Sequence, residues 1–318
     1  RIAGYRNFAN KLWNASRFTL MNLEGFEPEG IDLDRLDLSP ADTWILCRLA
    51  EAARETNQAL RDYKFNDAAG VLYAFTWNSF CDWYIELVKD DLYGADPAVK
   101  RRAQSVLYVV LESLLRLLHP LMPFITEEIW QALPGRRPTT FLVEAPYPTG
   151  EGLPYAERSV AGMELIMEVI KGIRNIRGEM DVAPSKQIQA VLDCKSEASA
   201  AVLRAGAGYI KALARVGELT LGVGVERPAQ AATQVAGDVE ILLPLAGLIN
   251  VEEEEKRLLK EIAKVEKDVE LFAKKLANEN FVANAPRHVL EKDRAKLAEA
   301  EEKLAILQES LRKIQALR

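Results

Sequence analysis

The chain has 318 residues, of which 49% are hydrophobic and 28% charged, with a formal net charge of -6. This composition supports at least one buried core, the length indicates two or three domains, and the acidity argues against binding nucleic acid through bulk charge. A local basic face could still act, because charges more than about 10 Å away are screened. No apolar run approaches the roughly 20 residues that span a bilayer, and no signal-peptide pattern opens the chain. We therefore expect a cytoplasmic protein without membrane contact.

The potential metal ligands are few and scattered. Cys47, Cys81 and Cys194 form no C-x-x-C pair, and only two histidines could join them. Neither a disulfide framework nor a metal site is expected. The chain opens on Arg1 and a helical pattern follows at once, so we expect it to be the C-terminal part of a longer protein.

The segment 5–21 separates into two unlike faces when it is turned through the helical period. One face is apolar and predicts packing against a core. The other carries hydrogen-bond donors and one aromatic ring, without a carboxylate: Arg6, Asn7, Asn10, Lys11, Asn14, Arg17 and Phe18. Such side chains suit a single-stranded RNA loop, because amides and guanidinium groups pair with base edges, cations with phosphates, and a ring with an unstacked base. The alternative is a solvated basic face whose Phe18 packs on a neighbouring helix.

Two further helices are predicted next. Ser39-Pro40 supplies a cap and a favoured first residue for a helix to about residue 61, with Asp42 in its first turn. The segment 66–90 is apolar around most of its circumference, which is typical of a helix inside a bundle. Its polar strip is Asn78, Asp82 and Glu86. Without a histidine or lysine beside them, these carboxylates indicate a solvated face and not acid/base catalysis.

Two more helices complete the predicted bundle. Asp96-Pro97 begins one that ends at His119-Pro120, and Pro123 begins a short one to about residue 133. Short connections between these helices predict an antiparallel arrangement. The segment 135–155 is rich in Pro and Gly, with a brief extended piece at 141–143, and is expected to be a linker or a strap across the bundle.

The pattern then changes to mixed helix and strand. A helix is predicted at 157–179, with Arg174, Asn175 and Arg177 pointing away from its apolar side. Strands are predicted at 187–192, 218–221 and 239–243, and a helix at 197–216 that is interrupted by two glycines. This is the pattern of a small α+β domain.

The last part of the chain is rich in Glu, Lys, Ala and Leu from residue 252. Apolar residues follow heptad spacing in two runs, separated by turn-forming residues at 278–286. We expect an antiparallel coiled-coil hairpin of roughly 40 Å at 1.5 Å per residue.

Several motifs together resemble a known family. They are RNFANKLWNASRF at 6–18, FCDWYIELVK at 80–89, HPLMPFITEEIW at 119–130, RNIRGEMDVAPSK at 174–186 and NENFVANAP at 278–286. The chain resembles the region that follows the catalytic domain in valyl-tRNA synthetases, which are class I enzymes. The second and third motifs are shared with the isoleucyl and leucyl enzymes. The valyl assignment therefore depends on the opening motif and the C-terminal hairpin.

The resemblance implies a mainly α fold in three parts: an anticodon-binding helical bundle at 1–134, a small α+β domain at 157–250 and a coiled-coil tRNA-binding arm at 251–318. A linker at 135–156 joins the first two. The implied partner is tRNA for valine, bound by a monomer. Neither the H-I-G-H nor the K-M-S-K-S motif of class I synthetases is present. No catalytic site and no cofactor are therefore expected in this chain, whereas the intact ligase would use ATP with Mg.

The resemblance also implies sites. In the opening helix, Phe18 would stack on an anticodon base, Lys11 and Asn14 would donate to base edges, and Arg17 would hold phosphate, with Asn10 beside them. Weaker anticodon candidates are Asn78 and Trp83. The candidates for the tRNA elbow are Lys264, Lys274, Lys275, Arg287 and Arg294.

Two alternatives stay open. One is an isoleucyl-tRNA synthetase, although its bacterial members commonly end in a cysteine-rich zinc module and this chain ends in heptads. The other is a scaffold, in which the hairpin dimerises or binds a partner protein and the bundle only supports it.

Overall fold

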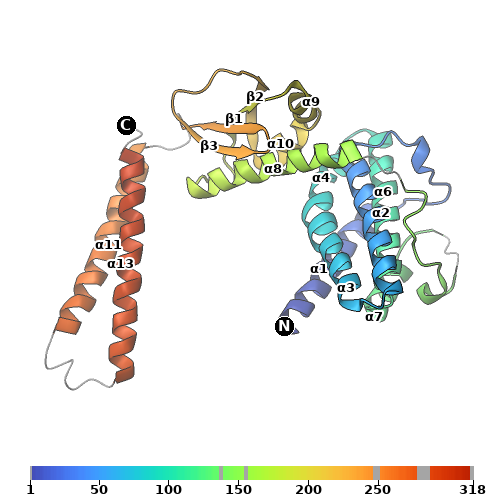
Figure 1. Cartoon of the computed structure of the whole chain (residues 1–318), viewed down its shortest axis with the longest axis horizontal. Helices are drawn as coiled ribbons and strands as arrows, with labels where there is room; N and C mark the ends of the chain where they lie inside the picture. Colours follow the sequence, from blue (N-terminus) through green and yellow to red (C-terminus); the bar gives the residue numbers. More distant parts are fainter. Residues whose placement is uncertain (1, 136–138, 154–156, 246–250, 278–286, 316–318) are drawn as a thin grey trace.

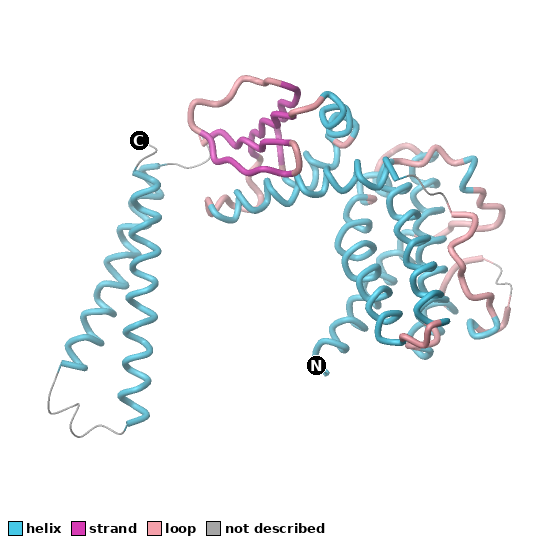
Figure 2. Tube along the Cα trace, in the orientation of Figure 1, coloured by secondary structure: helices cyan, strands magenta, loops and turns pink. Residues whose placement is uncertain are grey.

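The computed structural model describes residues 2–135, 139–153, 157–245, 251–277 and 287–315. Figure 1 shows a helical bundle, a small sheet covered by helices, and a two-helix hairpin. Helices dominate the described residues, and the strands lie together in one place (Figure 2). The predicted fold class, mainly α with a small α+β part and a C-terminal helix pair, is confirmed.

The bundle contains α1 (Ile2–Asn22), α2 (Pro40–Arg61), α3 (Phe65–Ala74), η2 (Phe75–Tyr84), α4 (Ile85–Leu87), α5 (Lys89–Tyr93), α6 (Pro97–Leu118) and α7 (Pro123–Gln131), with a short 3-10 turn, η1 (Leu33–Arg35), between α1 and α2. The predicted caps are confirmed. The Ser39 hydroxyl accepts from the Asp42 N–H, and the Asp42 carboxylate accepts from the Ser39 N–H in return. Asp96 caps α6 with its carboxylate alone, which accepts from the Ala98 and Val99 N–H groups. Each satisfies backbone groups that a helix end leaves without partners.

The helix predicted at 66–90 is not a regular α-helix. Its middle, η2, is a π-helix, in which the Ile85 N–H reaches back to the Phe80 carbonyl. This i to i+5 bonding places roughly one extra residue in each turn. Its buried residues are Phe75, Thr76, Phe80 and Tyr84.

The extended piece predicted at 141–143 is wrong. The chain there forms a 3-10 turn, η3 (Leu142–Glu144). Two carboxylates hold the turn: Glu127 accepts from the Leu142 N–H at 2.9 Å, and Glu144 accepts from the Phe141 N–H at 3.2 Å. The prediction failed because Glu127 comes from α7 and its contact is not visible in the local sequence.

The rest of this segment crosses the bundle as a strap. The Tyr147 hydroxyl donates to the Leu117 carbonyl at 3.0 Å, and the Asn57 amide donates to the Pro148 carbonyl at 2.7 Å. Burial raises the pKa of Tyr147 to about 12. Its hydroxyl therefore keeps its proton and remains a donor across the neutral pH range.

The α+β part contains α8 (Glu157–Glu179), β1 (Ile188–Cys194), α9 (Glu197–Ala205), α10 (Ala207–Ala214), β2 (Val216–Val223), β3 (Ala231–Ala236) and β4 (Val239–Pro244). The strand order is β2-β1-β4-β3; β1 and β2 are parallel and the other pairs antiparallel. The three predicted strands are confirmed. The sequence did not predict β3, because its half-exposed residues lie at a sheet edge and lack a clear apolar alternation.

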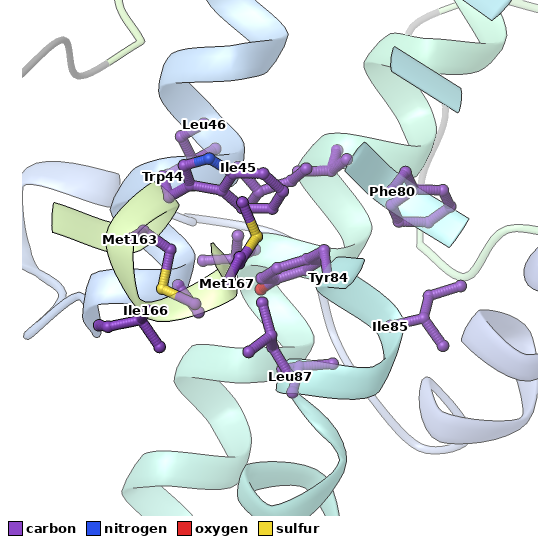
Figure 3. Close-up of a cluster of buried hydrophobic side chains, with 14 of the residues drawn as sticks. Trp44, Ile45, Leu46, Phe80, Tyr84, Ile85, Leu87, Met163, Ile166 and Met167 are labelled. Atoms are coloured by element: carbon purple, nitrogen blue, oxygen red, sulfur yellow. The ribbon is translucent and has the colours of Figure 1, made fainter. Parts of the chain in front are cut away.

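The bundle and the α+β part share one core. Figure 3 shows Met163 and Met167 of α8 beside Trp44 and Tyr84 of the bundle. On its other side α8 packs on the sheet, so closely that a Cβ at Gly172 would lie 2.4 Å from the Ile241 Cδ1 atom. Helix α8 therefore belongs to both parts, although the sequence indicated a boundary just before it.

One predicted orientation on α8 is wrong. Arg177 was expected to point away from the apolar side, but it is buried, with 7% of its surface exposed. Its guanidinium donates to the Ala183 carbonyl at 2.8 Å and to the Ala214 carbonyl at 3.4 Å. These acceptors come from the loop after α8 and from the end of α10, so the local pattern of α8 could not reveal them.

The C-terminal helices α11 (Val251–Ala277) and α13 (Arg287–Gln315) pair along their length. Lys275 Nζ lies 2.7 Å from an Asp293 carboxylate oxygen, and Lys303 Nζ lies 3.7 Å from Glu261. Residues late in α11 thus meet residues early in α13, which confirms the antiparallel hairpin. We call this pair the arm hairpin. The turn predicted at 278–286 lies outside the described residues.

Asp293 lies in the apolar row of α13 and is only 5% exposed. Leucine at this position removes the cost of burying the carboxylate, and Lys275 is not left as a buried charge because its side chain is 43% exposed. Asp293→Leu should therefore stabilise the arm hairpin by about 1–2 kcal/mol. Hydrogen exchange of α11 and α13 amides measures this local stability. Glu299→Leu, at an exposed position of the same helix, is the control and should change little. Faster exchange in Asp293→Leu would contradict the prediction.

Candidate nucleic-acid interface

Helix α1 packs alongside the segment 73–89, and both run in the same direction. The Phe8 ring stacks on Tyr73 with centroids 5.1 Å apart, and Tyr73 stacks on Trp77 at 5.6 Å. The Lys11 ammonium lies 4.0 Å from the Trp77 ring centroid. The predicted apolar stripe of α1 faces the core, and Leu12 in this stripe is fully buried. A row of aromatic rings with a cation at its end therefore lies between the two helices.

The opposite face of α1 carries an exposed row of donors. Asn10, Asn14 and Arg17 are all exposed and lie on one side of the helix. Within the described residues, none of the three has a side-chain hydrogen bond or an ion pair. This row is accessible to a binding partner and contains no carboxylate.

Lys11 and Phe18 lie at the edge of this row, against the neighbouring helix. Lys11 forms an ion pair with Asp82 of η2. Phe18 is half-buried against the core, and the Lys89 ammonium lies 5.9 Å from its ring centroid. The packing of Phe18 follows the alternative that the sequence left open. Lys11, by contrast, forms its ion pair with Asp82, which the sequence analysis placed on a solvated strip.

Asn78 and Trp83 lie elsewhere, at an open pocket of about 530 Å³ between α2, η2 and α8. The structure therefore divides the predicted anticodon residues into two groups, one along α1 and one in this pocket. Two cations flank Trp83: Lys171 Nζ at 5.6 Å and the Arg174 guanidinium carbon at 5.9 Å from its ring centroid. Sequence reasoning did not select Lys171, whereas Arg174 belongs to the RNIRGEMDVAPSK motif that it did quote.

Acidic groups also line the pocket. Arg48 pairs there with Glu51 at 2.7 Å and also with Glu164 of α8. Such contacts are worth little when they are exposed to water, but they neutralise Arg48. The cationic side of the pocket is therefore the one near Trp83.

The Cys81 thiol is not activated for chemistry. Burial raises the pKa of the Cys81 thiol to about 12, so Cys81 carries no thiolate at neutral pH and is a poor nucleophile. Among the described residues, no group of three or more His, Cys, Asp or Glu side chains could hold a metal ion. No helix in the described part of the chain has the length and apolar content to cross a membrane.

The basic residues of the arm hairpin differ in their surroundings. Lys264 and Arg294 are exposed and have no ion-pair partner among the described residues. Lys274 pairs with Glu270 at 2.5 Å, and Lys275 pairs with the buried Asp293. The Arg287 side chain lies outside the described part. Lys264 and Arg294 are thus the two predicted elbow residues that are seen to be available to a partner.

Comparison with known proteins places these features in a family. The anticodon-binding domain of tRNA ligase matches residues 42–192, and the valyl tRNA synthetase tRNA binding arm matches residues 250–315. The valine–tRNA ligase of Syntrophotalea carbinolica is 67% identical over 317 residues, and that of Geobacter sulfurreducens is 61% identical over 317 residues; both alignments cover 100% of this chain. The chain belongs to the valine–tRNA ligase family.

Membership in the valine–tRNA ligase family confirms the predicted resemblance and favours the valyl over the isoleucyl alternative, because the arm that matches is the valyl one. The chain spans 35% and 36% of the lengths of these two relatives. The ligase of Bacillus subtilis is 42% identical over 290 residues, which are 91% of this chain and 33% of that protein. The range matched by the anticodon-binding domain includes Asn78 and Trp83 but begins after α1.

Proposed function

We propose that this chain recognises tRNA for valine in the cytoplasm, as a non-catalytic part of valine–tRNA ligase. The bundle binds the anticodon loop and the arm hairpin binds the outer corner of the tRNA. The observation that carries the proposal is the exposed, carboxylate-free row Asn10, Asn14 and Arg17 on α1. The names of the relatives and of the two matching domains support it. We propose that the chain binds as a monomer.

The contacts of each side chain suggest its role. Asn10 and Asn14 have free amides, which can donate to and accept from base edges. Arg17 is placed on the same face to hold a phosphate. Phe18 would offer only the part of its ring that packing leaves open, and Lys11 would have to exchange Asp82 for a nucleotide. Base reading is therefore expected mainly from the two asparagines.

ATP, Mg and valine belong to the activity of the whole ligase. ATP supplies the energy that activates the amino acid. Neither class I signature motif occurs in this sequence, and the described residues contain no metal-binding group. We therefore propose that the nucleotide and its metal bind outside this chain. Its own contribution to aminoacylation would be to hold and orient the tRNA.

Filter binding of an unmodified transcript of valine tRNA tests the proposal. Asn14→Ala should weaken binding by about 1–3 kcal/mol, the usual value of a good contact to a base edge. Phe18→Leu keeps an apolar side chain against the core and removes the ring, so it should cost about 1–3 kcal/mol if a base stacks there. Asn66→Ala, at an exposed asparagine of α3, is the matched control and should bind as the unchanged chain does.

The scaffold alternative gives the opposite outcome. Sedimentation of the chain with and without the transcript, at low and high salt, should show a complex that weakens steeply with salt. Self-association that does not depend on salt, together with no binding of RNA, would contradict the proposed function.

A further inference from the structure

Two arginines of α8 reach the end of α10. Arg174 Nε donates to the Leu213 carbonyl at 3.0 Å, and Arg177 donates to the Ala214 carbonyl at 3.4 Å. These carbonyls end the helix and carry the negative end of its dipole. The arrangement fixes both guanidinium groups at the junction between α8, α10 and the start of the sheet.

A third arginine adds to the positive charge at this junction. Arg215 follows α10 in the left-handed conformation, with φ of 55°, and its side chain is exposed. Burial and the charge of Arg215 lower the pKa of Arg177. Within the described residues, none of Lys171, Arg174, Arg177 and Arg215 forms an ion pair with a carboxylate. Positive charge is therefore concentrated here without a counterion.

The exposed cations form a line that continues into the bundle. Lys171 and Arg174 lie about one helical turn apart on α8 and both approach the Trp83 ring. Arg174 also contacts the end of α10, just before Arg215. The line therefore runs from an aromatic ring of η2, along α8, to the edge of the sheet, while Arg177 lies buried beneath it.

We propose that Lys171, Arg174 and Arg215 bind consecutive phosphates of an RNA strand, beside the Trp83 ring. The inference rests on the proposed function and adds to it a second contact surface, separate from the donor row of α1. Unpaired cations next to an aromatic ring are the combination that binds a nucleic-acid backbone with little regard to sequence. Arg177 positions this surface by fixing the end of α10 and does not itself touch the RNA.

The salt dependence of tRNA binding tests the inference. Arg174→Gln with Arg215→Asn removes two charges, and asparagine tolerates the left-handed backbone at position 215. Loss of two phosphate contacts should reduce the slope of log affinity against log salt by about 1.5. The ratio of the affinity of the unchanged chain to that of the double variant should therefore fall about eightfold between about 50 and 200 mM salt. Arg204→Gln removes an exposed charge on α9, near the other end of β1, and should leave the slope unchanged.

A second variant separates charge from structure. Arg174→Lys keeps the charge but loses the bond from Nε to the Leu213 carbonyl. It should therefore keep most of the slope of log affinity against log salt. Thermal unfolding of each variant reports any damage to the fold. A double variant that binds with the slope of the unchanged chain would overturn the inference while leaving the proposed function intact. If the unchanged chain binds no tRNA, both fail; if it binds and only the Asn14 and Phe18 variants lose affinity, this inference alone fails.

Discussion

Asp42→Ala is expected to lower the free energy of unfolding of the bundle by about 3–5 kcal/mol, the largest effect among the variants considered. Asp42 is 1% exposed, and its carboxylate accepts from the Tyr84 hydroxyl at 2.7 Å and from the Ser39 hydroxyl at 2.8 Å. Arg102 Nε lies 2.8 Å from it. Without the Asp42 carboxylate, the nearly buried Arg102 guanidinium keeps the Asp91 carboxylate and a long bond to the Asp37 carbonyl, and the Tyr84 hydroxyl loses its acceptor.

Urea unfolding followed by circular dichroism measures this loss. Burial and the neighbouring Asp42 raise the pKa of Tyr84 well above its usual value, so the tyrosine remains a donor in neutral buffer and the comparison is valid there. Asp67→Ala removes an exposed carboxylate from the first turn of α3 and should cost well under 1 kcal/mol. A similar small loss for Asp42→Ala would show that the buried network contributes little.

Arg177→Met should destabilise the α+β part by about 3 kcal/mol. Methionine can fill the space of the aliphatic stem, but it leaves the carbonyls of Ala183, Pro184, Ala214 and Arg215 without the guanidinium that donates to them. Each buried carbonyl that loses its donor costs on the order of 1 kcal/mol, and solvent recovers part of the loss.

Hydrogen exchange of the Ile188 amide reports on this region, because it donates to the Arg215 carbonyl at 3.1 Å. Its exchange should become faster in Arg177→Met, while the amides of α2 change less. Arg174→Met is the matched control, since Arg174 is exposed and donates to a single carbonyl. Equal effects of the two variants would mean that burial of Arg177 adds nothing.

The boundaries of most helices could be predicted because their signals are local. Ser39 and Asp96 are each followed by proline at the first helical position, and both caps form as expected. The strands β1 and β4 were found for a similar reason: buried residues alternate along β1, and β4 is a short apolar run that is buried on both faces. Where a neighbouring residue supplies the contact, the sequence is sufficient.

The errors arise where the partner is far along the chain or where the period changes. The π-helix η2 has more residues per turn than an α-helix, so a wheel drawn at 3.6 residues per turn does not describe this segment. The piece at 141–143, predicted to be extended, is a 3-10 turn because Glu127 of another helix accepts a hydrogen bond from its backbone. Neither effect leaves a mark in the local pattern.

The candidate site shows the same division. The donor row of α1 follows from its periodicity alone, and its exposed asparagines lie where the wheel places them. The pairing of Lys11 with Asp82 joins residues 71 positions apart and needed the packing of η2 on α1. The line of cations from Lys171 to Arg215 likewise depends on how α10 ends against α8.

The shared position of α8 has a consequence for dividing the chain. A cut at 135–156, where proline and glycine suggest a natural border, would remove Met163 and Met167 from the bundle and open the side of Trp44 to water. Exposed side chains of this size promote aggregation. The shortest piece expected to remain soluble with an intact bundle therefore ends beyond residue 179 and includes the sheet, since the face of α8 that packs on the sheet would otherwise be exposed to water.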